Sequence, residues 1–211
     1  MFTGIVSHIG RIIEVLPQAV GGKDAGVQLT IEAPGFLRSN TRLGDSIAIE
    51  GACMTVVAIP DNARHTFVVD VSRESLDRTV GLQALGEVNL EHALCLGDSL
   101  DGHLVSGHVD GIATVTRFTQ VGESWELRLQ IPADFAHYMA YKGSVTVNGV
   151  SLTINAVTDH AQGCEISINL IPHTLEVTTL KNLRTGKEVN FEVDMLARYV
   201  ERMANYRPTP V

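Results

Sequence analysis

The chain has 211 residues, 45% of them apolar, which is enough to bury the core of one large domain or two small ones. Its formal net charge of -8 leaves no continuous basic surface to follow a phosphate backbone, so we do not expect a nucleic acid partner. The N-terminus has no basic stretch followed by an apolar one, and no run approaches the ~18 apolar residues of a membrane span, so we expect a soluble, cytoplasmic protein without membrane association.

Short strands are the commonest predicted elements. Along residues 27–33, Val27, Leu29 and Ile31 alternate with polar residues, which is typical of a strand buried on one face, and residues 125–131 show the same alternation. Many short strands with regular turn signals indicate a small closed barrel. Polar and glycine-containing segments predict loops between the strands at 20–26, 59–65, 119–124 and 158–163.

Helices are predicted at three places. Residues 33–39 and 132–142 are interpreted as short helices between strands. After Asp194, apolar residues recur at helical spacing as far as Met203, with Asp194 as a candidate N-cap and Pro208 beyond the end. A lone exposed helix should not carry such an apolar stripe, so we expect it to pack on the barrel or on copies of itself in an oligomer.

The chain repeats itself once, at a separation of 98 to 103 residues. EGACMTVV, from Glu50, matches NGVSLTIN, from Asn148. Because a solenoid needs at least about three copies to bury its faces, two copies this long predict tandem domains. We expect an N-terminal barrel over 1–97, a C-terminal barrel over 98–194 and an oligomerisation helix over 195–211. Across five matched blocks the pairs include Gly4 with Gly107, Ser46 with Ser144, Cys53 with Ser151, Thr55 with Thr153, Leu76 with Leu175 and Asn89 with Asn190.

Small polar residues recur on one face of the matched strands. Cys53 and Thr55 are two residues apart, so their side chains leave a strand on the same face, and Ser151 and Thr153 do so in the second copy. Ser46 adds a third polar group from the preceding strand. Such groups on an apolar wall suit a flat heteroaromatic ligand with donors and acceptors on its rim. The alternative is that Cys53 is a small side chain packed near the core.

One histidine differs between the copies. His103 and His108 are five residues apart in GHLVSGHVDG, on opposite faces of an ideal strand, so we expect no metal site. His108 takes the place of Ile5, and a group that titrates near neutral pH in one copy only can serve as acid or base; a surface histidine is the alternative. The three cysteines include no Cys-x-x-Cys pair, which favours reduced thiols, and no nucleotide-binding or serine-hydrolase motif occurs.

Five motifs in order, MFTGIV, EGACMTVV, GHLVSGHVDG, YKGSVTVNGVSLTI and LIPHTLEVTTL, closely resemble the riboflavin synthase alpha-chain family over the full length. The resemblance implies an all-β fold of two tandem, homologous six-stranded Greek-key barrels that bind lumazine, followed by a C-terminal helix. It also implies a homotrimer in which the N-terminal barrel of one subunit faces the C-terminal barrel of its neighbour. An association with lumazine synthase stays open.

The activity implied by the resemblance is a dismutation. Two molecules of 6,7-dimethyl-8-ribityllumazine become riboflavin and 5-amino-6-ribitylaminouracil by transfer of a four-carbon unit, without a metal or redox cofactor. Two similar pockets would hold two copies of one substrate face to face, which is largely catalysis by proximity. Because one lumazine must be donor and the other acceptor, the unequal positions, Cys53 against Ser151 and His108 against Ile5, are expected to matter.

Site residues follow from the same resemblance. His108, with Ser46 and Cys53, would handle the proton of the acidic ring methyl and the nucleophile added to the acceptor ring, while Asp194 would assist or only cap the helix. Glu50 departs from the asparagine that is common in the family, which bears on ring contacts there. The N-terminal pocket would be lined by Gly4, Ile5, Val6, Cys53, Met54, Thr55, Asp70, Glu74 and Ser75. The C-terminal pocket would be lined by Gly107, His108, Val109, Ser151, Leu152, Thr153, Asn169, Ile171, Pro172, His173 and Thr174, with Lys142 near the interface.

Two other functions compete with the enzyme. Non-catalytic lumazine- or flavin-binding proteins of the same fold retain a bound chromophore, but they are expected to lose polar pocket residues that this chain keeps. The flavin-binding barrel of ferredoxin-reductase-like oxidoreductases carries an Arg-x-Tyr-Ser motif and a nucleotide domain, both absent from this sequence. The enzyme is therefore the favoured interpretation.

Overall fold

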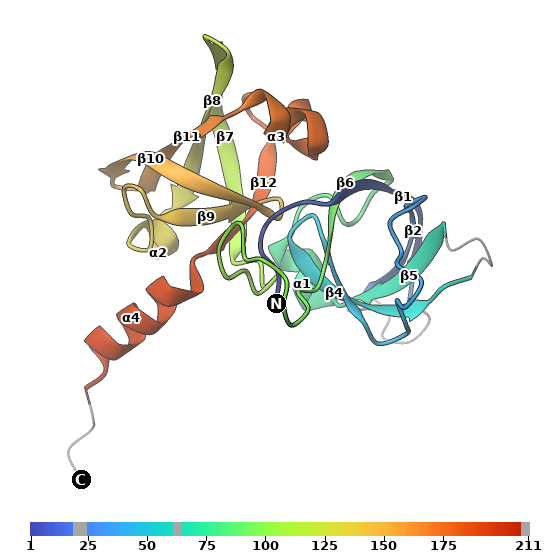
Figure 1. Ribbon diagram of the computed structural model, residues 1–211. Helices are drawn as coiled ribbons and strands as arrows, with labels where there is room; N and C mark the ends of the chain where they lie inside the picture. The colour runs from blue at the N-terminus through green and yellow to red at the C-terminus, as the bar shows by residue number, and fades with distance from the viewer. Residues whose placement is uncertain (19–24, 61–64, 208–211) are drawn as a thin grey trace.

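The computed structural model of the chain describes residues 1–18, 25–60 and 65–207. Two closed antiparallel barrels of six strands each lie side by side (Figure 1). The N-terminal barrel comprises β1 (His8–Pro17), β2 (Val27–Glu32), β3 (Ser46–Ile49), β4 (Ala52–Ala58), β5 (Thr66–Val71) and β6 (Gly86–His92). The C-terminal barrel comprises β7 (Gly111–Val121), β8 (Ser124–Pro132), β9 (Ser144–Val147), β10 (Val150–His160), β11 (Gly163–Leu170) and β12 (Glu188–Val193).

The two barrels have one topology. Hydrogen bonds connect β1-β2-β5-β4-β3-β6 around the first barrel and β7-β8-β11-β10-β9-β12 around the second. In each, three consecutive antiparallel strands are followed by a fourth that returns beside the first of them, which is Greek-key order. Even the register shifts in β1 and β7 correspond, after Ile12 and after Val115. The predicted fold class is confirmed.

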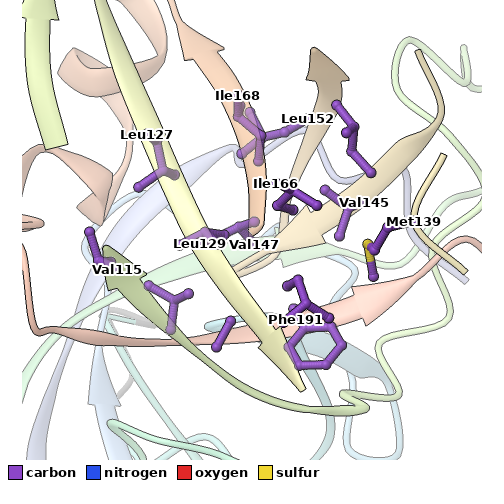
Figure 2. Close-up of a cluster of buried hydrophobic side chains, with 14 of the residues drawn as sticks. Val115, Leu127, Leu129, Met139, Val145, Val147, Leu152, Ile166, Ile168 and Phe191 are labelled. Carbon is purple, nitrogen blue, oxygen red and sulfur yellow. The ribbon is translucent and has the colours of Figure 1, made fainter. Parts of the chain in front are cut away.

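Alternate residues of each strand fill the barrels. Along β4, Ala52, Met54 and Val56 are buried inside, whereas Cys53 and Thr55 point outward, so the prediction that these two share a face is confirmed. Figure 2 shows the equivalent core of the C-terminal barrel, where the Phe191 ring, 1% exposed, packs among aliphatic side chains. The interiors are therefore packed cores, and any ligand site must lie on the outer faces or between the barrels.

Helices are few and short. They are α1 (Arg73–Arg78), α2 (Ala133–Ala136), α3 (Pro172–Val177), the 3-10 helix η2 (Thr179–Asn182) and α4 (Met195–Asn205). The helix predicted over 33–39 is wrong: these residues form turns, and Gly35 has a φ of 79°, which a right-handed helix does not accommodate. Of the helix predicted over 132–142, only the four residues of α2 are helical. The expected loops at 20–26 and 59–65 lie partly, and Pro208 wholly, outside the described residues.

The C-terminal helix is confirmed. The Asp194 side chain caps α4 by accepting a hydrogen bond from the Leu196 N–H at 2.9 Å. Figure 1 shows α4 projecting away from the C-terminal barrel, and its apolar side chains are exposed, Met203 by 77%. No helix in residues 1–18, 25–60 and 65–207 is long and apolar enough to span a membrane.

The barrels meet at two equivalent hairpin turns, Glu50–Gly51 between β3 and β4 and Asn148–Gly149 between β9 and β10. All four residues have positive φ, from 47° to 88°, as in two-residue hairpins of the type that favours Asn-Gly. The turns pack back to back, so that a Cβ added to Gly51 would lie 2.8 Å from the backbone nitrogen of Gly149. This contact explains both glycines without any ligand.

A buried polar network surrounds these turns. The Asn89 side chain donates to the Asn148 carbonyl at 2.9 Å, and the Asn190 side chain donates to the Glu50 carbonyl at 3.0 Å. The Glu50 carboxylate accepts from the Asn89 N–H at 2.6 Å and from the Thr179 hydroxyl at 3.0 Å. Burial raises the pKa of Glu50 to about 7, against the opposing effect of these hydrogen bonds. Glu50 thus belongs to the interface between the barrels.

Candidate active site

The segments that precede the two barrels are exchanged between them. Phe2, ahead of β1, forms an antiparallel bridge with Val105, ahead of β7. Beyond this crossing, the Gly4 carbonyl accepts a hydrogen bond from the Ser151 N–H of β10 at 2.8 Å, and the Gly107 carbonyl accepts one from the Cys53 N–H of β4 at 2.7 Å. Residues 4–6 therefore lie on the C-terminal barrel, and residues 105–109 lie on the N-terminal barrel.

The exchanged segments approach the strands too closely for a side chain. A Cβ on Gly107 would lie 2.7 Å from the Cys53 Cβ, and a Cβ on Gly4 would lie 2.6 Å from the Ser151 Cβ. Both glycines also have a positive φ, 78° and 76°, which other residues rarely adopt. Glycine is thus required at each position because it lets the segment cover the polar face of the strand.

This exchange corrects the expected grouping of the pocket residues. Gly107, His108 and Val109 were expected beside Ser151, but they lie beside Cys53, and Val109 packs against the core of the N-terminal barrel. Gly4 and Val6 were expected beside Cys53, but Gly4 contacts Ser151 and Val6 packs against the C-terminal core. Ile5, between them, is 46% exposed. The reason is that each segment crosses to the other barrel before its own first strand begins.

A cavity of about 900 Å³ lies outside the N-terminal barrel, between β4, α1, residues 106–110 and α4. It brings together the Cys53 and Met54 positions of β4, Glu74 and Ser75 of α1, and the segment that carries His108. Its size is that of a typical small-molecule site. The lining residues are Met1, Ala52, Cys53, Met54, Glu74, Ser75, Arg78, Thr79, Ser106, Gly107, His108, Val109, Asp110, Met195, Arg198, Tyr199 and Arg202.

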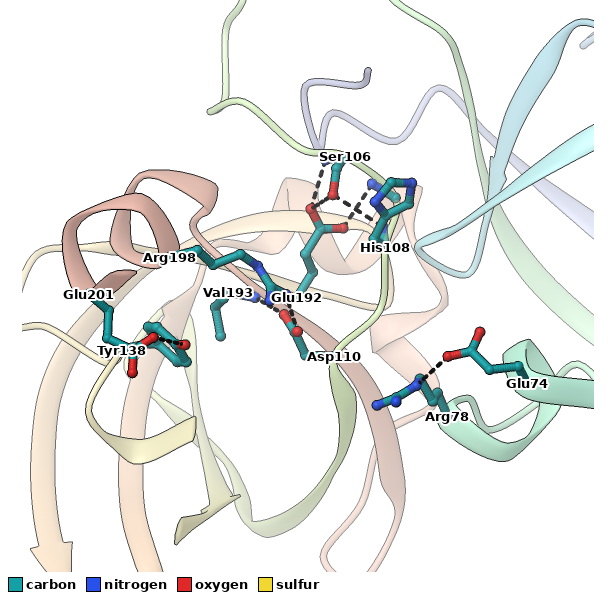
Figure 3. A network of polar contacts seen from close by, with 11 residues as sticks. Glu74, Arg78, Ser106, His108, Asp110, Tyr138, Glu192, Val193, Arg198 and Glu201 are labelled. Atoms are coloured by element: carbon teal, nitrogen blue, oxygen red, sulfur yellow. Dashed lines mark hydrogen bonds and ion pairs between the residues drawn. The ribbon is translucent and has the colours of Figure 1, made fainter. Parts of the chain in front are cut away.

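Charges are arranged in pairs around this cavity. On α1, Arg78 forms an ion pair with Glu74 at 2.6 Å. Across the cavity, Arg198 of α4 pairs with the buried Asp110, which also accepts from the Val193 N–H at 2.8 Å (Figure 3). His108 is exposed at the cavity wall, and Cys53 is half-buried. The site therefore combines a thiol and an imidazole with paired charges at its rim.

Two glutamates that the sequence analysis did not single out hold the exchanged segments. Glu192 of β12 accepts from the Ser106 N–H and hydroxyl, each at 2.7 Å, and from the Gly107 N–H at 2.9 Å. Glu91 of β6 accepts the equivalent hydrogen bonds from Thr3 and Gly4. Burial raises the pKa of both carboxyls. The repeat offered a signal, since both glutamates stand two residues after the matched Asn89 and Asn190.

On the polar face of the C-terminal barrel, the side chain beside Ser151 is that of His103. Ser151 Oγ lies 2.7 Å from His103 Nδ1, and His103 Nε2 lies 3.3 Å from the Thr146 hydroxyl. Burial lowers the pKa of His103, although the charge of Asp194 opposes this effect. His103 thus contributes a mostly uncharged imidazole at Ser151. The sequence analysis interpreted His103 only as an unsuitable metal ligand.

The other predicted residues are distributed around these two faces. Ser46 and Thr55 are cross-strand partners outside the cavity lining. Lys142 contacts Asn155 at 3.0 Å, and Asn169 accepts from Ser124 at 2.8 Å. Asp70 accepts from Gln28 at 3.0 Å, Leu152 is in the C-terminal core, and Thr153 is exposed, while Ile171, Pro172, His173 and Thr174 form the start of α3. In the part of the chain that the structure describes, no three His, Cys, Asp or Glu side chains gather closely enough to hold a metal ion.

Known proteins share both the sequence and the fold. The lumazine binding domain family model matches residues 3–93 and again 106–194. The riboflavin synthase of Brucella abortus is 42% identical over 98% of this chain and 100% of its own length. That of Mycobacterium tuberculosis is 40% identical over 96% of this chain and 98% of its own.

Solved structures lead to the same group of proteins. The crystal structure of LumP complexed with 6,7-dimethyl-8-(1'-D-ribityl) lumazine superimposes with a TM-score of 0.76 at 26% identity, over 92% of this chain and 99% of LumP. LumP complexed with riboflavin gives the same TM-score and coverage. With two lumazine-binding domains, and relatives about 40% identical over nearly its whole length, the chain belongs to the riboflavin synthase family.

Proposed function

We propose that the protein is a riboflavin synthase that converts two molecules of 6,7-dimethyl-8-ribityllumazine into riboflavin and 5-amino-6-ribitylaminouracil. The named relatives and the two lumazine-binding domains support this substrate. The atoms of the two lumazines balance those of the two products, so the transfer of the four-carbon unit needs neither an external oxidant nor water. Binding, orientation and proton transfer are then the tasks of the protein.

The observation that carries the proposal is that Cys53 and His108 line one cavity. In the repeat, these are two positions at which a nucleophilic or titratable side chain replaces a less reactive one, since Ser151 and Ile5 are their counterparts. In this proposal, His108 accepts the proton of the acidic ring methyl, and Cys53 contacts the ring that receives the nucleophile. Ser46 lies outside the cavity lining, so its proposed part is secondary. Asp194 is assigned to the helix cap.

A second subunit completes the reacting pair in this proposal. The residues lining the cavity include Cys53 and His108 but not Ser151, Thr153 or Asn169, which are on the outside of the C-terminal barrel. A homotrimer would bring the second lumazine, bound on a neighbour's C-terminal barrel, to this cavity. The exposed apolar residues of α4 support such an assembly, because a helix face of this kind is normally covered.

The decisive experiment is incubation of the purified protein with the lumazine alone. An enzyme produces flavin fluorescence that keeps increasing to many equivalents of product per subunit. A static spectral shift that saturates at one or two equivalents would instead show a lumazine-binding protein, the alternative favoured by the likeness to LumP. Product identity is checked by chromatography against riboflavin.

His108→Ala separates binding from turnover. Because His108 is exposed at the cavity wall and its side chain makes no hydrogen bond to the residues that the structure describes, the variant should bind lumazine nearly as the parent does. Loss of a general acid or base typically slows turnover ~100-fold or more. Titration of lumazine fluorescence gives the affinity, and flavin formation gives kcat. Unchanged kcat would remove His108 from the mechanism.

A further inference from the structure

We propose that Glu192 is a positioning residue that sets the reacting geometry at Cys53 and His108, and that Glu91 does the same for the Ser151 face. The proposal deepens the function given above, and its catalytic consequences depend on that function. Neither glutamate touches the cavity, because neither is among its lining residues. Each acts through the peptide that it holds.

The Glu192 carboxylate collects three donors from two consecutive residues. Oε1 accepts from the Ser106 N–H and hydroxyl, and Oε2 accepts from the Gly107 N–H. Glu192 is only 3% exposed, so these charge-assisted bonds are shielded from water. Figure 3 shows the carboxylate directly beneath Ser106, with the His108 ring beside it. The segment is therefore fixed at the two residues that precede His108.

The peptide that Glu192 holds is hydrogen-bonded toward both Cys53 and His108. On one side, the Gly107 carbonyl accepts the Cys53 N–H at 2.7 Å, so fixing Gly107 fixes its distance from the thiol-bearing strand. On the other side, the His108 N–H donates to Ser106 Oγ at 3.3 Å, and this hydroxyl itself donates to Glu192. Glu192 thus determines the backbone position from which the imidazole extends.

The second copy provides an internal control. Glu91 accepts from the Thr3 N–H and hydroxyl and from the Gly4 N–H, and Thr3 Oγ1 accepts from the Ile5 N–H at 3.1 Å. The Gly4 carbonyl accepts the Ser151 N–H at 2.8 Å. Each hydrogen bond of Glu192 to its segment has an equivalent at Glu91, but the residue that follows the held glycine is Ile5 instead of His108. The same substitution at the two glutamates should therefore affect different faces.

Asp110 adds further contacts to the segment on the Cys53 side. Asp110, two residues after His108, is buried and binds both the Val193 N–H and Arg198 of α4. Its counterpart in the first copy, Ser7, donates to the Leu90 carbonyl. The segment carrying His108 is thus held at both ends by carboxylates. Proton transfer requires a fixed orientation of the transferring group, and these contacts provide it.

The test uses the thiol of Cys53 as a reporter. Gly107 and Phe2 cover this side chain, so release of residues 106–107 should expose it. Cys95→Ala removes the exposed thiol, and Cys164 is buried. In this background, the half-buried Cys53 is therefore the thiol that iodoacetamide can alkylate. Glutamine at position 192 retains one carbonyl acceptor but turns an N–H toward the Gly107 N–H. Glu192→Gln should therefore increase the alkylation rate of Cys53 about 10-fold or more, whereas Glu91→Gln should leave it within about 2-fold of the parent.

A reciprocal reporter distinguishes positioning from loss of stability. With Cys53→Ser, Cys95→Ala and Ser151→Cys combined, Glu91→Gln should accelerate alkylation at position 151 and Glu192→Gln should not. Equal acceleration of both reporters by either glutamine would indicate general loosening and overturn the proposal, as would unchanged rates. Far-ultraviolet circular dichroism and thermal unfolding show that the variants compared are folded.

Turnover is measured separately, in the chain with all its cysteines. Glu192→Gln should lower kcat about 10- to 100-fold with a change in KM of less than about 3-fold, because orientation is lost and binding surface is kept. A rise in KM at unchanged kcat would contradict the positioning role. If the parent forms no flavin, the proposed function fails, but the two alkylation experiments still decide whether the glutamates hold the segments.

Discussion

Replacing Glu50 by glutamine should make the protein more stable above neutral pH while leaving its stability at acidic pH nearly unchanged. Glu50 is 7% exposed, and burial raises the pKa of its carboxyl from 4.5 to about 7. The folded chain therefore binds a proton that the unfolded chain releases between these values. The favourable contribution is complete below pH 4.5 and is lost as the pH rises through 7.

The size of the effect follows from the two ionisation constants. A tenfold difference between the folded and unfolded constants corresponds to 1.36 kcal/mol, so ionised Glu50 lowers the free energy of unfolding by about 3 kcal/mol at pH 8. Glutamine does not ionise. It can accept the Asn89 N–H and donate to the Thr179 hydroxyl, so both contacts have a replacement. Glu50→Gln should then exceed the parent by about 3 kcal/mol at pH 8, and by less than about 1 kcal/mol at pH 5.

Urea unfolding between pH 5 and 8 measures this difference, followed by circular dichroism and by the fluorescence of Trp125, the single tryptophan. Subtraction of the two chains cancels other titrating groups, including Glu91 and Glu192, whose raised pKa values act in the same direction. Glu123→Gln, at an exposed glutamate, is the matched control. Parallel stability curves for parent and Glu50→Gln would refute the assignment of an ionising carboxyl buried between the barrels.

Two further predictions concern the exchanged segment and the C-terminal helix. Gly107→Ala should cut turnover at least ~10-fold and lower the melting temperature by several degrees, because its Cβ would lie 2.7 Å from the Cys53 Cβ. The control is Gly81→Ala, at a residue with a φ of 91° but open space around it. This variant should lose stability without a change in turnover. Leu196→Asp, at a side chain 60% exposed on α4, should convert the proposed trimer to the 22.8 kDa monomer in light scattering after gel filtration; an unchanged mass would exclude this helix from the assembly.

The repeat made most of the fold predictable. Matched segments 98 to 103 residues apart predicted two domains, and the alternation at 27–33 and 125–131 located β2 and β8. The helix after Asp194 was clear because its apolar spacing continues over three turns. By contrast, α1 and α3 have six residues each, too few for a helical period to stand out, and the sequence analysis predicted a helix at neither.

The exchange between the barrels could not be predicted. A repeat shows which residues are equivalent, but it does not show whether a segment packs on its own copy or on the other. Gly4 fits against Ser151 as Gly107 fits against Cys53, and the unexchanged pairing would satisfy the same pattern of small and apolar residues. Glu50 illustrates a related limit: its departure from Asn148 was visible, but only the packing of the two turns shows that it acts on the interface.

The exchange determines which side chains of the two copies share a site. Cys53 and His108 are 55 residues apart and belong to different copies, so in unexchanged barrels each pocket would receive one of the two distinctive side chains. Because residues 105–109 cross to the N-terminal barrel, the thiol and the imidazole line one cavity, and the other face keeps Ser151 beside Ile5 and His103. Two substitutions in separate halves thus place a thiol and an imidazole at one site and a serine hydroxyl beside His103 at the other. In the proposed reaction, such a difference would let two identical molecules take the different roles of donor and acceptor.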